Sequence, residues 1–366
     1  MFRHTRTHTP LTDPGAVDGD RHSALLRTRL PELWELNGLI DQAGELLRAR
    51  TLTRVAVGAQ QLPVVLIEMG SDAPDAPVLG LIGGVHGVER IGSQVVIAFL
   101  RLLLARLGWD EGLAEELRHI KLFMLPILNP GGMWYNLRSN PNGVDLMRNA
   151  PVEAQQRVPW LIGGQRLSPQ LPWYRGRAGA PMEAELAALC AYVRQQVLPH
   201  PFALTLDCHS GYGSRDRLWL PYAGRTTPID RLDAMYRLHR LFARSYRHHR
   251  FYLVEPQSHS YTTHGDAWDL LYDDARARYP EHCYLPLTLV LGSWLWVKKN
   301  PRQLLRFASL FNPVVPHRHT RILRRHLPLL EFLLAAARSY QRWLPVGAQQ
   351  ARHDTQAALK HWYGSR

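Results

Sequence analysis

The stretch Val78–Glu89 (VLGLIGGVHGVE) combines a predicted buried strand, a sharp turn and two side chains that can bind a metal. Its apolar run, 78–82, is typical of a strand covered on both faces, and the two glycines that follow end it. His86 and Glu89 come next, before a helical pattern over 91–107. Because ligand groups gather at the carboxyl ends of strands in parallel α/β sheets, this pair is a candidate for two ligands of one metal. A turn histidine beside a solvated glutamate would give the same pattern.

The composition is that of a folded globular protein with a basic surface. The chain has 366 residues, of which 46% are hydrophobic, so it can bury one large core or two moderate ones. Its 44 Lys and Arg residues outnumber 31 Asp and Glu residues, but they are scattered and no nucleic-acid-binding motif accompanies them. We therefore expect a solvated basic surface, which would attract anionic substrates, and no nucleic-acid partner.

The cysteines and the apolar runs indicate in which cellular compartment the protein is expected. Cys190, Cys208 and Cys283 are odd in number and have no paired spacing, so we expect a reducing compartment without a disulfide framework. The polar N-terminus has no apolar core of signal-peptide length. The most apolar late stretch, 327–337, contains a proline and a glutamate and is too short to span a bilayer. A soluble, cytoplasmic protein with no membrane partner is the expectation.

The order of the other elements favours an α/β sheet. Residues 24–50 have helical spacing, and 53–57 with 62–69 form a hairpin candidate around a Gly-Ala-Gln-Gln turn. Further buried strands are predicted at 120–128 and 202–206, with helical patterns between the strands. This alternation predicts a parallel or mixed sheet with helices on its faces.

The chain is expected to form one domain with a tail at each end. Residues 1–23 lack periodicity and are expected to be a disordered basic tail. The domain is predicted over 24–343, ending in a long amphipathic helix, and 344–366 reads as a polar tail. Within the domain, 151–181 is rich in Pro, Gly, Arg and Trp and is expected to be an irregular insertion.

The end of the second strand leads into a loop with two arginines. Arg138 and Arg148 lie ten residues apart, after an Asn-Pro-Gly-Gly turn that closes the strand 120–128. The planar fork of an arginine binds carboxylates and oxyanions through two hydrogen bonds. Two surface arginines in a long loop would look the same from the sequence.

The strand predicted over 202–206 supplies a third metal-binding side chain. It runs into Asp207 and His209, which point to the same side of an extended chain. A nearby carboxylate commonly orients a metal-bound imidazole, although Asp207 could instead bind a neighbouring group. His86, Glu89 and His209 would supply two nitrogens and one oxygen, which leaves a fourth position open as catalytic zinc requires.

With these residues in place, the chain resembles the zinc metallocarboxypeptidases related to carboxypeptidases A and B. His86 and Glu89 match that family's His-x-x-Glu motif, and His209 matches its third ligand, so the resemblance implies one bound Zn²⁺ ion. The likeness covers roughly residues 78–299, with six motif positions in the family's order. It implies a three-layer α/β/α sandwich with a mixed, mostly parallel central sheet.

The resemblance also implies residues that bind the substrate. Arg138 would stabilise the oxyanion that develops during hydrolysis. Arg148 and Asn149, which end the signature Gly-Val-Asp-Leu-Met-Arg-Asn, would hold the free carboxylate of a peptide or acyl-amino-acid substrate. Tyr261 would close over the substrate, and its spacing to Asp269 follows the family pattern.

Two positions indicate an altered substrate site. Met147 stands where the family has an asparagine beside the carboxylate-binding arginine, so one hydrogen-bond donor to the carboxylate is missing. Trp268 stands where the family places its specificity residue. A tryptophan there argues for an apolar or cramped pocket and against a basic terminal side chain.

The departure with the largest consequence is Val290. It lies in the segment 287–292 (LTLVLG), in the place of the family's catalytic glutamate. Valine cannot accept a proton from the attacking water or return one to the leaving amine, and such acid–base work contributes roughly 10²–10⁴-fold to rate. Three explanations stay open: a relative that keeps zinc but has lost hydrolysis, a substitution in an active lineage, or replacement by another carboxylate such as Glu281. The sequence thus predicts a zinc carboxypeptidase with impaired hydrolysis or, alternatively, a catalytically inactive zinc-containing protein that binds carboxylate ligands.

Overall fold

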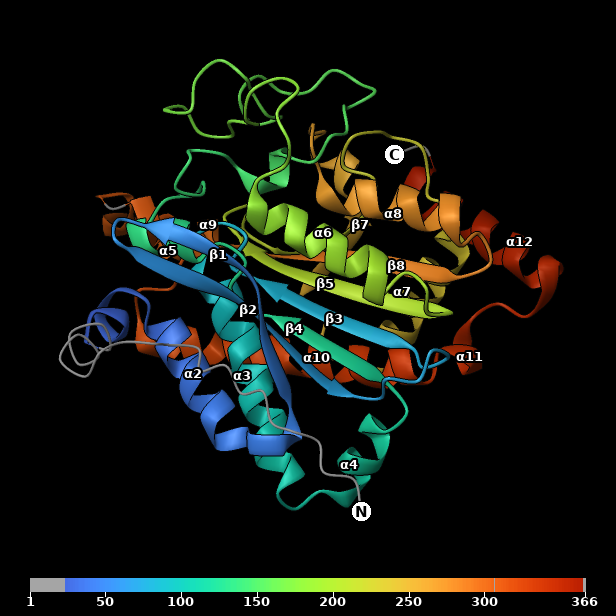
Figure 1. Ribbon diagram of the computed structural model, residues 1–366. Coiled ribbons are helices and arrows are strands. Elements are labelled where there is room, and N and C mark those ends of the chain that lie inside the picture. The colour runs from blue at the N-terminus through green and yellow to red at the C-terminus, as the bar shows by residue number, and fades with distance from the viewer. Residues whose placement is uncertain (1–23, 306, 365–366) are drawn as a thin grey trace.

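An eight-stranded mixed sheet with the strand order β1-β2-β4-β3-β5-β8-β6-β7 runs through the centre of the protein (Figure 1). The structure is a computed structural model and describes residues 24–305 and 307–364, so the expected tail at 1–23 lies outside the described residues. The strands are β1 Arg48–Val57, β2 Gln60–Gly70, β3 Val78–Gly83, β4 Lys121–Leu125, β5 Phe202–Ser210, β6 Asp216–Leu220, β7 Tyr252–Pro256 and β8 Cys283–Leu291.

The centre of the sheet is parallel and its flanks are mixed. Strands β4, β3, β5 and β8 pair in parallel, whereas β1–β2, β2–β4 and β6–β8 pair antiparallel. Every residue of the four central strands is buried, in keeping with their nearly continuous apolar sequences. Because these strands run the same way, their carboxyl ends meet at one edge of the sheet.

Helices cover both faces of this sheet. Helices α3 and α10 contact β3 and β5 on one face, and α6 and α8 lie on the other face, where α8 contacts β8 (Figure 1). The predicted three-layer α/β/α architecture with a mixed sheet is therefore confirmed. The helices are α2 Pro31–Ala43, α3 Arg90–Leu107, α4 Glu111–Leu117, α5 Pro130–Tyr135, α6 Ala184–Gln196, α7 Leu232–Ser245, α8 Ala267–Arg278, α9 Trp294–Lys299, α10 Pro316–Arg338, α11 Tyr340–Trp343 and α12 Gly347–Ala358.

The segment 344–366 differs from the expected polar tail. Residues Gly347–Ala358 form helix α12, which packs on α7 and continues into a π-helical turn. Ala358 and Trp362 are buried, and the Trp362 indole donates a hydrogen bond of 2.8 Å to the Val254 carbonyl oxygen. Ala358 and Trp362 thus lie on the face that contacts the domain, whereas Val346 is exposed.

The segment 151–181 contains no helix and runs as long loops at the top of the view in Figure 1. Arg175 anchors it, because its guanidinium donates to the Arg148 carbonyl oxygen and, over 2.8 Å, to each carboxylate oxygen of Glu153. The insertion is thereby tied to the loop that carries the candidate substrate-binding arginine.

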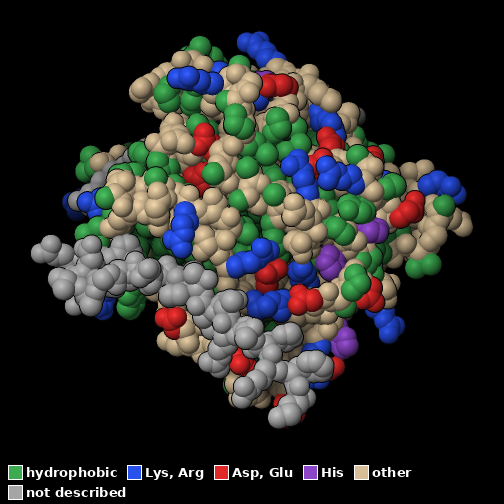
Figure 2. Space-filling view, viewed as in Figure 1, with side chains coloured by type: hydrophobic (Ala, Val, Ile, Leu, Met, Phe, Trp, Pro, Cys, Tyr) green, Lys and Arg blue, Asp and Glu red, His purple; other side chains and the backbone are tan. Residues whose placement is uncertain are grey.

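The surface carries both signs of charge. Figure 2 shows basic and acidic side chains interspersed over the face in view, several of them side by side. Within the described part of the chain, no single helix is long and apolar enough to cross a membrane. Helices α3 and α4 reach that length and composition only together, and they are bent by 118° at the break between them.

Candidate metal centre and substrate pocket

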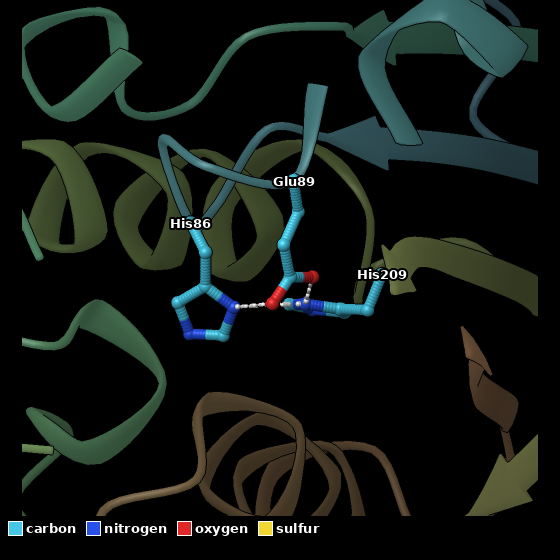
Figure 3. A group of neighbouring side chains, drawn as sticks. All are labelled: His86, Glu89 and His209. Atoms are coloured by element: carbon cyan, nitrogen blue, oxygen red, sulfur yellow. Dashed lines mark hydrogen bonds and ion pairs between the residues drawn. The ribbon is translucent and has the colours of Figure 1, made fainter. Parts of the chain in front are cut away.

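Three side chains from two strand ends converge at the carboxyl edge of the sheet. His86 lies in the turn after β3, Glu89 immediately precedes α3, and His209 is the penultimate residue of β5. They point toward one another (Figure 3), are all buried, and offer ligand atoms that lie within 4.8 Å of one another. The structure thus brings together the three ligands expected from the sequence.

Two glycines permit this convergence. A Cβ at Gly87 would lie 2.0 Å from the Gly132 carbonyl carbon, and one at Gly92 would lie 2.1 Å from the Cys208 carbonyl oxygen. Because these two positions have no side chain, the turn after β3 can lie against Gly132 and the first turn of α3 can lie against Cys208 on β5. The approach of α3 to β5 is what places Glu89 beside His209.

The second nitrogen of each imidazole contacts a carboxylate. His86 Nε2 lies 3.0 Å from Asp145 Oδ1, and His209 Nε2 lies 2.7 Å from Asp207 Oδ2. Asp207 favours the His209 tautomer protonated at Nε2, which leaves its Nδ1 lone pair free to bind a metal. At His86 Nε2, the acceptor Asp145 is joined by the donor Arg138, whose Nη2 also lies 3.0 Å away. The two Nδ1 atoms face each other at 3.2 Å, and Glu89 Oε1 lies 3.0 Å from Nδ1 of His86. Two imidazole nitrogens and one carboxylate oxygen around a shared point fit a zinc ion.

The electrostatics of the cluster favour a positive charge at the same place. Burial alone would raise the pKa of Glu89, but charge and hydrogen bonding from His86 and His209 hold that pKa far below its usual range. Burial alone would lower the pKa of His209, but Asp207 and Glu89 raise it to about 10. The surrounding carboxylates therefore stabilise a cation, which either a protonated imidazole or a metal ion can supply.

Arg138 lies beside this cluster. Its Nε donates to Asp145 over 2.9 Å and its Nη1 donates to Glu89 Oε1 over 3.0 Å. Burial would lower the pKa of this guanidinium, but Asp145 and Glu89 raise it, so Arg138 stays charged. A fixed cation within hydrogen-bond reach of the metal ligands can stabilise negative charge that develops there.

A cavity of about 720 Å³ opens above the cluster, and we call it the main cavity. Its floor includes the three metal-binding side chains, Arg138 and Arg148, and its walls are largely apolar and aromatic. The residues of these walls come from segments that are far apart in the sequence: Met147, Pro159, Ile162, Pro172, Trp173, Tyr212, Trp219, Tyr261, Trp294 and Phe311.

The residues expected to bind a terminal carboxylate divide into two groups. Arg148 and Met147 line the main cavity, and the Arg148 guanidinium is held by hydrogen bonds of 3.0 Å to the carbonyl oxygens of Ile162 and Met147. Asn149 does not line the cavity. Its amide instead accepts from the Glu183 N–H and donates to the Arg175 carbonyl oxygen, so it holds the insertion and α6 in place.

Tyr261 lines the main cavity and also a second cavity that it shares with residues 157–160 of the insertion. Its ring centroid lies 5.3 Å from that of Tyr212 and 5.8 Å from that of Trp219. Burial raises the pKa of its hydroxyl, so this group stays protonated and can donate a hydrogen bond.

Trp268 does not reach the main cavity, in contrast to its expected place as a specificity residue. It is buried, and its indole donates over 2.9 Å to Asp207, the carboxylate that also contacts His209. Asp269 is likewise engaged, because it accepts from the N–H groups of Ala223 and Gly224. Successive helical residues are rotated by about 100°, so the first turn of α8 directs Trp268 into the core while Asp266 lines the cavity.

Val290 lines the main cavity on β8 and is directly opposite His209 in the strand register. Glu281 precedes the start of β8 and is exposed. The seven-residue separation of Cys283 and Val290 within the strand places the two ends about 23 Å apart at the usual rise. Glu281 therefore lies too far away to supply the carboxylate that the resemblance leads us to expect at position 290.

Comparison with known proteins agrees with this site. The family model described as zinc carboxypeptidase matches residues 42–288. The chain belongs to the zinc carboxypeptidase family. The matched residues thus extend from before the β1–β2 hairpin into β8 and include all three candidate metal ligands.

Individual relatives within the zinc carboxypeptidase family are distant. Carboxypeptidase E of Caenorhabditis elegans is 30% identical over 118 residues, 28% of this chain and 25% of that protein. Carboxypeptidase D of Mus musculus is 24% identical over 151 residues, 39% of this chain and 9% of that protein. The chain thus spans a quarter or less of the curated relatives it matches.

Solved structures show the same fold at low sequence identity. The crystal structure of thrombin-activatable fibrinolysis inhibitor superposes with a TM-score of 0.60 at 15% identity, covering 83% of this chain and 72% of that one. Carboxypeptidase A from Helicoverpa armigera superposes with a TM-score of 0.57 at 15% identity, covering 89% and 73% of the two chains.

Two functional side chains were not singled out from the sequence. Asp145 contacts both His86 and Arg138, and its only signal was its place in the Gly-Val-Asp signature. Asp266 lines the main cavity, and the only indication of it in the sequence was that an aspartate before a helix commonly caps its N-terminus, as Asp266 does for α8.

Proposed function

We propose that this protein binds one Zn²⁺ ion through His86, Glu89 and His209 and acts on the C-terminal peptide or amide bond of substrates with a free carboxylate. The observation that carries the proposal is the pair of Nδ1 atoms 3.2 Å apart, each on a ring whose other nitrogen contacts a carboxylate. When bound, zinc supplies a Lewis acid that polarises the scissile carbonyl and activates the attacking water.

The chain's own residues have distinct roles in this proposal. The Arg138 guanidinium is placed to stabilise negative charge on the carbonyl oxygen, because it already donates to Glu89 at the centre. The Arg148 guanidinium lines the same cavity and is the group we assign to the substrate's terminal carboxylate. Tyr261 supplies a protonated hydroxyl to a bound substrate, and Asp145 and Asp207 hold the two imidazoles.

Val290 limits what this site can catalyse. The isopropyl group is 3% exposed and faces the main cavity opposite His209, so no carboxylate is placed there to move protons. Loss of general acid–base work lowers a rate by roughly 10²–10⁴-fold. We propose that hydrolysis by this chain is correspondingly impaired.

The same observation favours a second candidate, a catalytically inactive zinc-containing relative that binds carboxylate-bearing ligands. The two candidates share the metal, the role of Arg148 and the ligand class, which is a peptide or acyl-amino acid with a free carboxylate. They differ only in turnover. Ligand binding that needs zinc and Arg148 but yields no product would favour the inactive relative.

We also propose a cytoplasmic location. Its support is that Cys190, Cys208 and Cys283 are buried free thiols, which is usual for proteins of reducing compartments. Burial raises the pKa of the Cys190 and Cys283 thiols to about 12, so these side chains are inert core residues.

The proposal is tested by metal content and turnover in the same samples. Purified protein should contain one zinc per chain by elemental analysis, and His209→Gln should lose it. His282→Gln removes a histidine outside the site and should keep the zinc. Hydrolysis of a panel of acyl-dipeptides is then measured with and without a chelator. A protein that binds no zinc, or binds it equally without His209, contradicts the proposal.

A further inference from the structure

The part of the chain that follows Glu281 carries positive charge without negative charge. Residues 282–330 contain eight Lys and Arg residues and no Asp or Glu. They form β8, α9, a 3₁₀ turn at Pro301–Leu305 and the first half of α10. A segment of this length with one sign of charge produces a positive potential over the surface that it covers.

Most of these basic side chains are not neutralised by the fold. Arg318 donates over 3.2 Å to the Trp296 carbonyl oxygen, and Arg325 pairs with Asp216 at 2.8 Å. Five others are exposed and form no hydrogen bond or ion pair with other described residues: Lys298, Lys299, Arg302, Arg321 and Arg324. Their charges are therefore available to a partner.

Acidic side chains that lie near this segment already have partners. Burial lowers the pKa of His319 in the first turn of α10, and Glu35 and Glu32 on α2 oppose that shift, so both carboxylates approach the segment. Glu32 pairs with Arg90, and Glu35 pairs with Arg101. These acids therefore do not compensate the exposed lysines and arginines.

Large apolar side chains are exposed in the same region. Leu305 is 84% exposed, Leu304 is 60% exposed and Trp294 is 57% exposed. Helix α9 contacts the turn Pro301–Leu305, so these side chains lie in one region with the lysines that end α9. Clustered exposed apolar groups mark an interaction site. We call the following side chains the docking surface: Trp294, Lys298, Lys299, Arg302, Leu304 and Leu305.

Hydrogen bonds behind the docking surface hold it in place. Gln303 is buried, and its amide donates to the carbonyl oxygens of Ser309 and Asn312 over 2.7 Å and 3.1 Å. The Asn312 amide in turn donates over 2.6 Å to the carbonyl oxygen of Val88, next to the metal ligand Glu89. The turn is thus fixed with Gln303 directed inward and the two following leucines directed to solvent.

The docking surface adjoins the main cavity. Trp294 lines that cavity, and its indole donates over 3.2 Å to the carbonyl oxygen of Gly211, two residues after His209. A partner seated on the docking surface therefore lies beside the candidate metal centre.

We propose that the docking surface binds a membrane that carries anionic lipids. Lys298, Lys299 and Arg302 contact the headgroups, and the tryptophan and the leucines enter the apolar boundary beneath them. Nucleic acid would attract the same charges, but exposed leucines contribute to binding only where the partner offers an apolar phase. This peripheral binding needs no spanning helix and no signal segment, and it replaces the expectation of a protein without a membrane partner.

Sedimentation of the full chain with lipid vesicles tests the proposal. One set of vesicles is phosphatidylcholine alone, and the other contains equal amounts of phosphatidylcholine and phosphatidylserine. The protein should bind the anionic set at least about tenfold more tightly. Raising the salt from about 0.1 M to about 1 M shortens the Debye length from about 10 Å to about 3 Å and should weaken this binding.

A matched pair of charge variants shows which surface binds. Lys298→Gln with Lys299→Gln should weaken binding to anionic vesicles about tenfold or more, because each basic residue near such a surface contributes about fivefold. Arg352→Gln with Lys360→Gln removes the same charge from exposed positions in α12 and the turn after it. Helices α9 and α12 lie at opposite sides of the view in Figure 1, so this control should bind as the wild type does.

A second pair of substitutions separates a bilayer from other polyanions. Leu304→Ser with Leu305→Ser keeps every charge and should still weaken binding to anionic vesicles. Duplex DNA is titrated in parallel, and its binding should be weaker than that of anionic vesicles and unchanged by the leucine substitutions. Thermal melting of each variant shows that the fold is intact.

Three results would overturn the proposal. They are equal binding to neutral and anionic vesicles, equal losses in the lysine variant and its control, and vesicle binding that the leucine variant keeps in full. In the last case, DNA binding as tight as vesicle binding would assign the segment to nucleic acid. None of these measurements needs zinc or turnover, so their outcome is independent of the proposed function.

Discussion

His209 and Val290 lie directly opposite each other in the parallel register of β5 and β8. Both side chains line the same cavity, so a group at position 290 is placed beside a candidate metal ligand. In this chain that group is an isopropyl side chain, which has no proton to give or accept. The relationship separates metal binding, for which all the groups are present, from proton transfer, for which the expected group is absent.

Asp207→Asn should weaken zinc binding by about tenfold to a hundredfold, because partners of metal-bound imidazoles tune ligand orientation and basicity to that extent. Asp207 contacts His209 Nε2 at 2.7 Å and is itself held by the Trp268 indole at 2.9 Å. Zinc affinity is measured by competition with a chromophoric chelator. Asp274→Asn, which removes a carboxylate that pairs with Arg194 and does not line the main cavity, serves as the control. An Asp207→Asn protein with wild-type affinity would show that this carboxylate only satisfies Trp268.

Zinc should stabilise the folded chain. At free zinc 100 times its Kd, binding adds about 2.7 kcal/mol to the free energy of unfolding, because the unfolded chain does not hold the three ligands together. For a chain of this size the melting temperature should rise by a few degrees. Differential scanning calorimetry with zinc and with excess chelator measures the shift. His86→Gln should melt at the same temperature under both conditions, and a zinc-dependent shift that persists in this variant would place the metal elsewhere.

Gly92→Ala should destabilise the fold, although alanine is normally the better helix former. The added Cβ would lie 2.1 Å from the Cys208 carbonyl oxygen on β5, so α3 must move away from the sheet at a cost of about 1–3 kcal/mol. Gly38→Ala is the matched control, because Gly38 lies inside α2 with nothing within 4 Å of its added Cβ. That variant should gain about 0.5–1 kcal/mol. Urea unfolding measures both, and equal effects would argue against close packing at Gly92.

His326 should make stability fall at acid pH. Burial lowers its pKa to about 4, while its Nδ1 lies 2.8 Å from the Tyr252 hydroxyl. Between pH 6.5 and pH 4 the unfolded chain binds a proton at this position that the folded chain does not, so the free energy of unfolding decreases as the pH falls. Over that window the loss is about 3 kcal/mol.

The charged neighbours of His326 act in opposite directions on this equilibrium. Asp216 raises its pKa, whereas Arg325 and His249 lower it. His326→Gln should flatten the pH dependence of the free energy of unfolding by one proton between pH 4 and 6.5. His239, whose pKa burial also lowers to about 4, would account for acid sensitivity that remains. An unchanged slope in His326→Gln would show that His326 is protonated in the folded state.

The sheet and the metal ligands were predictable because each depends on a local pattern. Buried strands have continuous apolar runs that end in glycines, and the residues after β3 and at the end of β5 carry the ligand types. Parallel strands then bring His86, Glu89 and His209 to one edge, whatever their separation in sequence. The assignment of Val290 to the place of the family's catalytic glutamate stays a prediction from the motif on β8.

The wall of the site was not predictable because it depends on helix rotation and on long-range contacts. Trp268 and Asp266 are two residues apart, and only the start of α8 decides which of them faces the cavity. Asp145 reaches His86 across 59 residues of chain, and no local pattern records that contact. Trp362 holds the C-terminal segment to the domain through a hydrogen bond to β7 and ring contacts with Tyr236 and His239 on α7, although its surroundings in the sequence are polar.

The most direct test of the account compares hydrolysis by the zinc-loaded wild-type protein, Val290→Glu and Val290→Gln. Each is given the same acyl-dipeptide panel, and kcat/KM is measured at matched zinc content. We predict that Val290→Glu hydrolyses at least one substrate about 100-fold or more faster than the wild type, and that Val290→Gln, which has a similar size but no proton acceptor, shows no gain. A wild-type protein that hydrolyses the panel as fast as Val290→Glu, in a chelator-sensitive manner, would contradict the account.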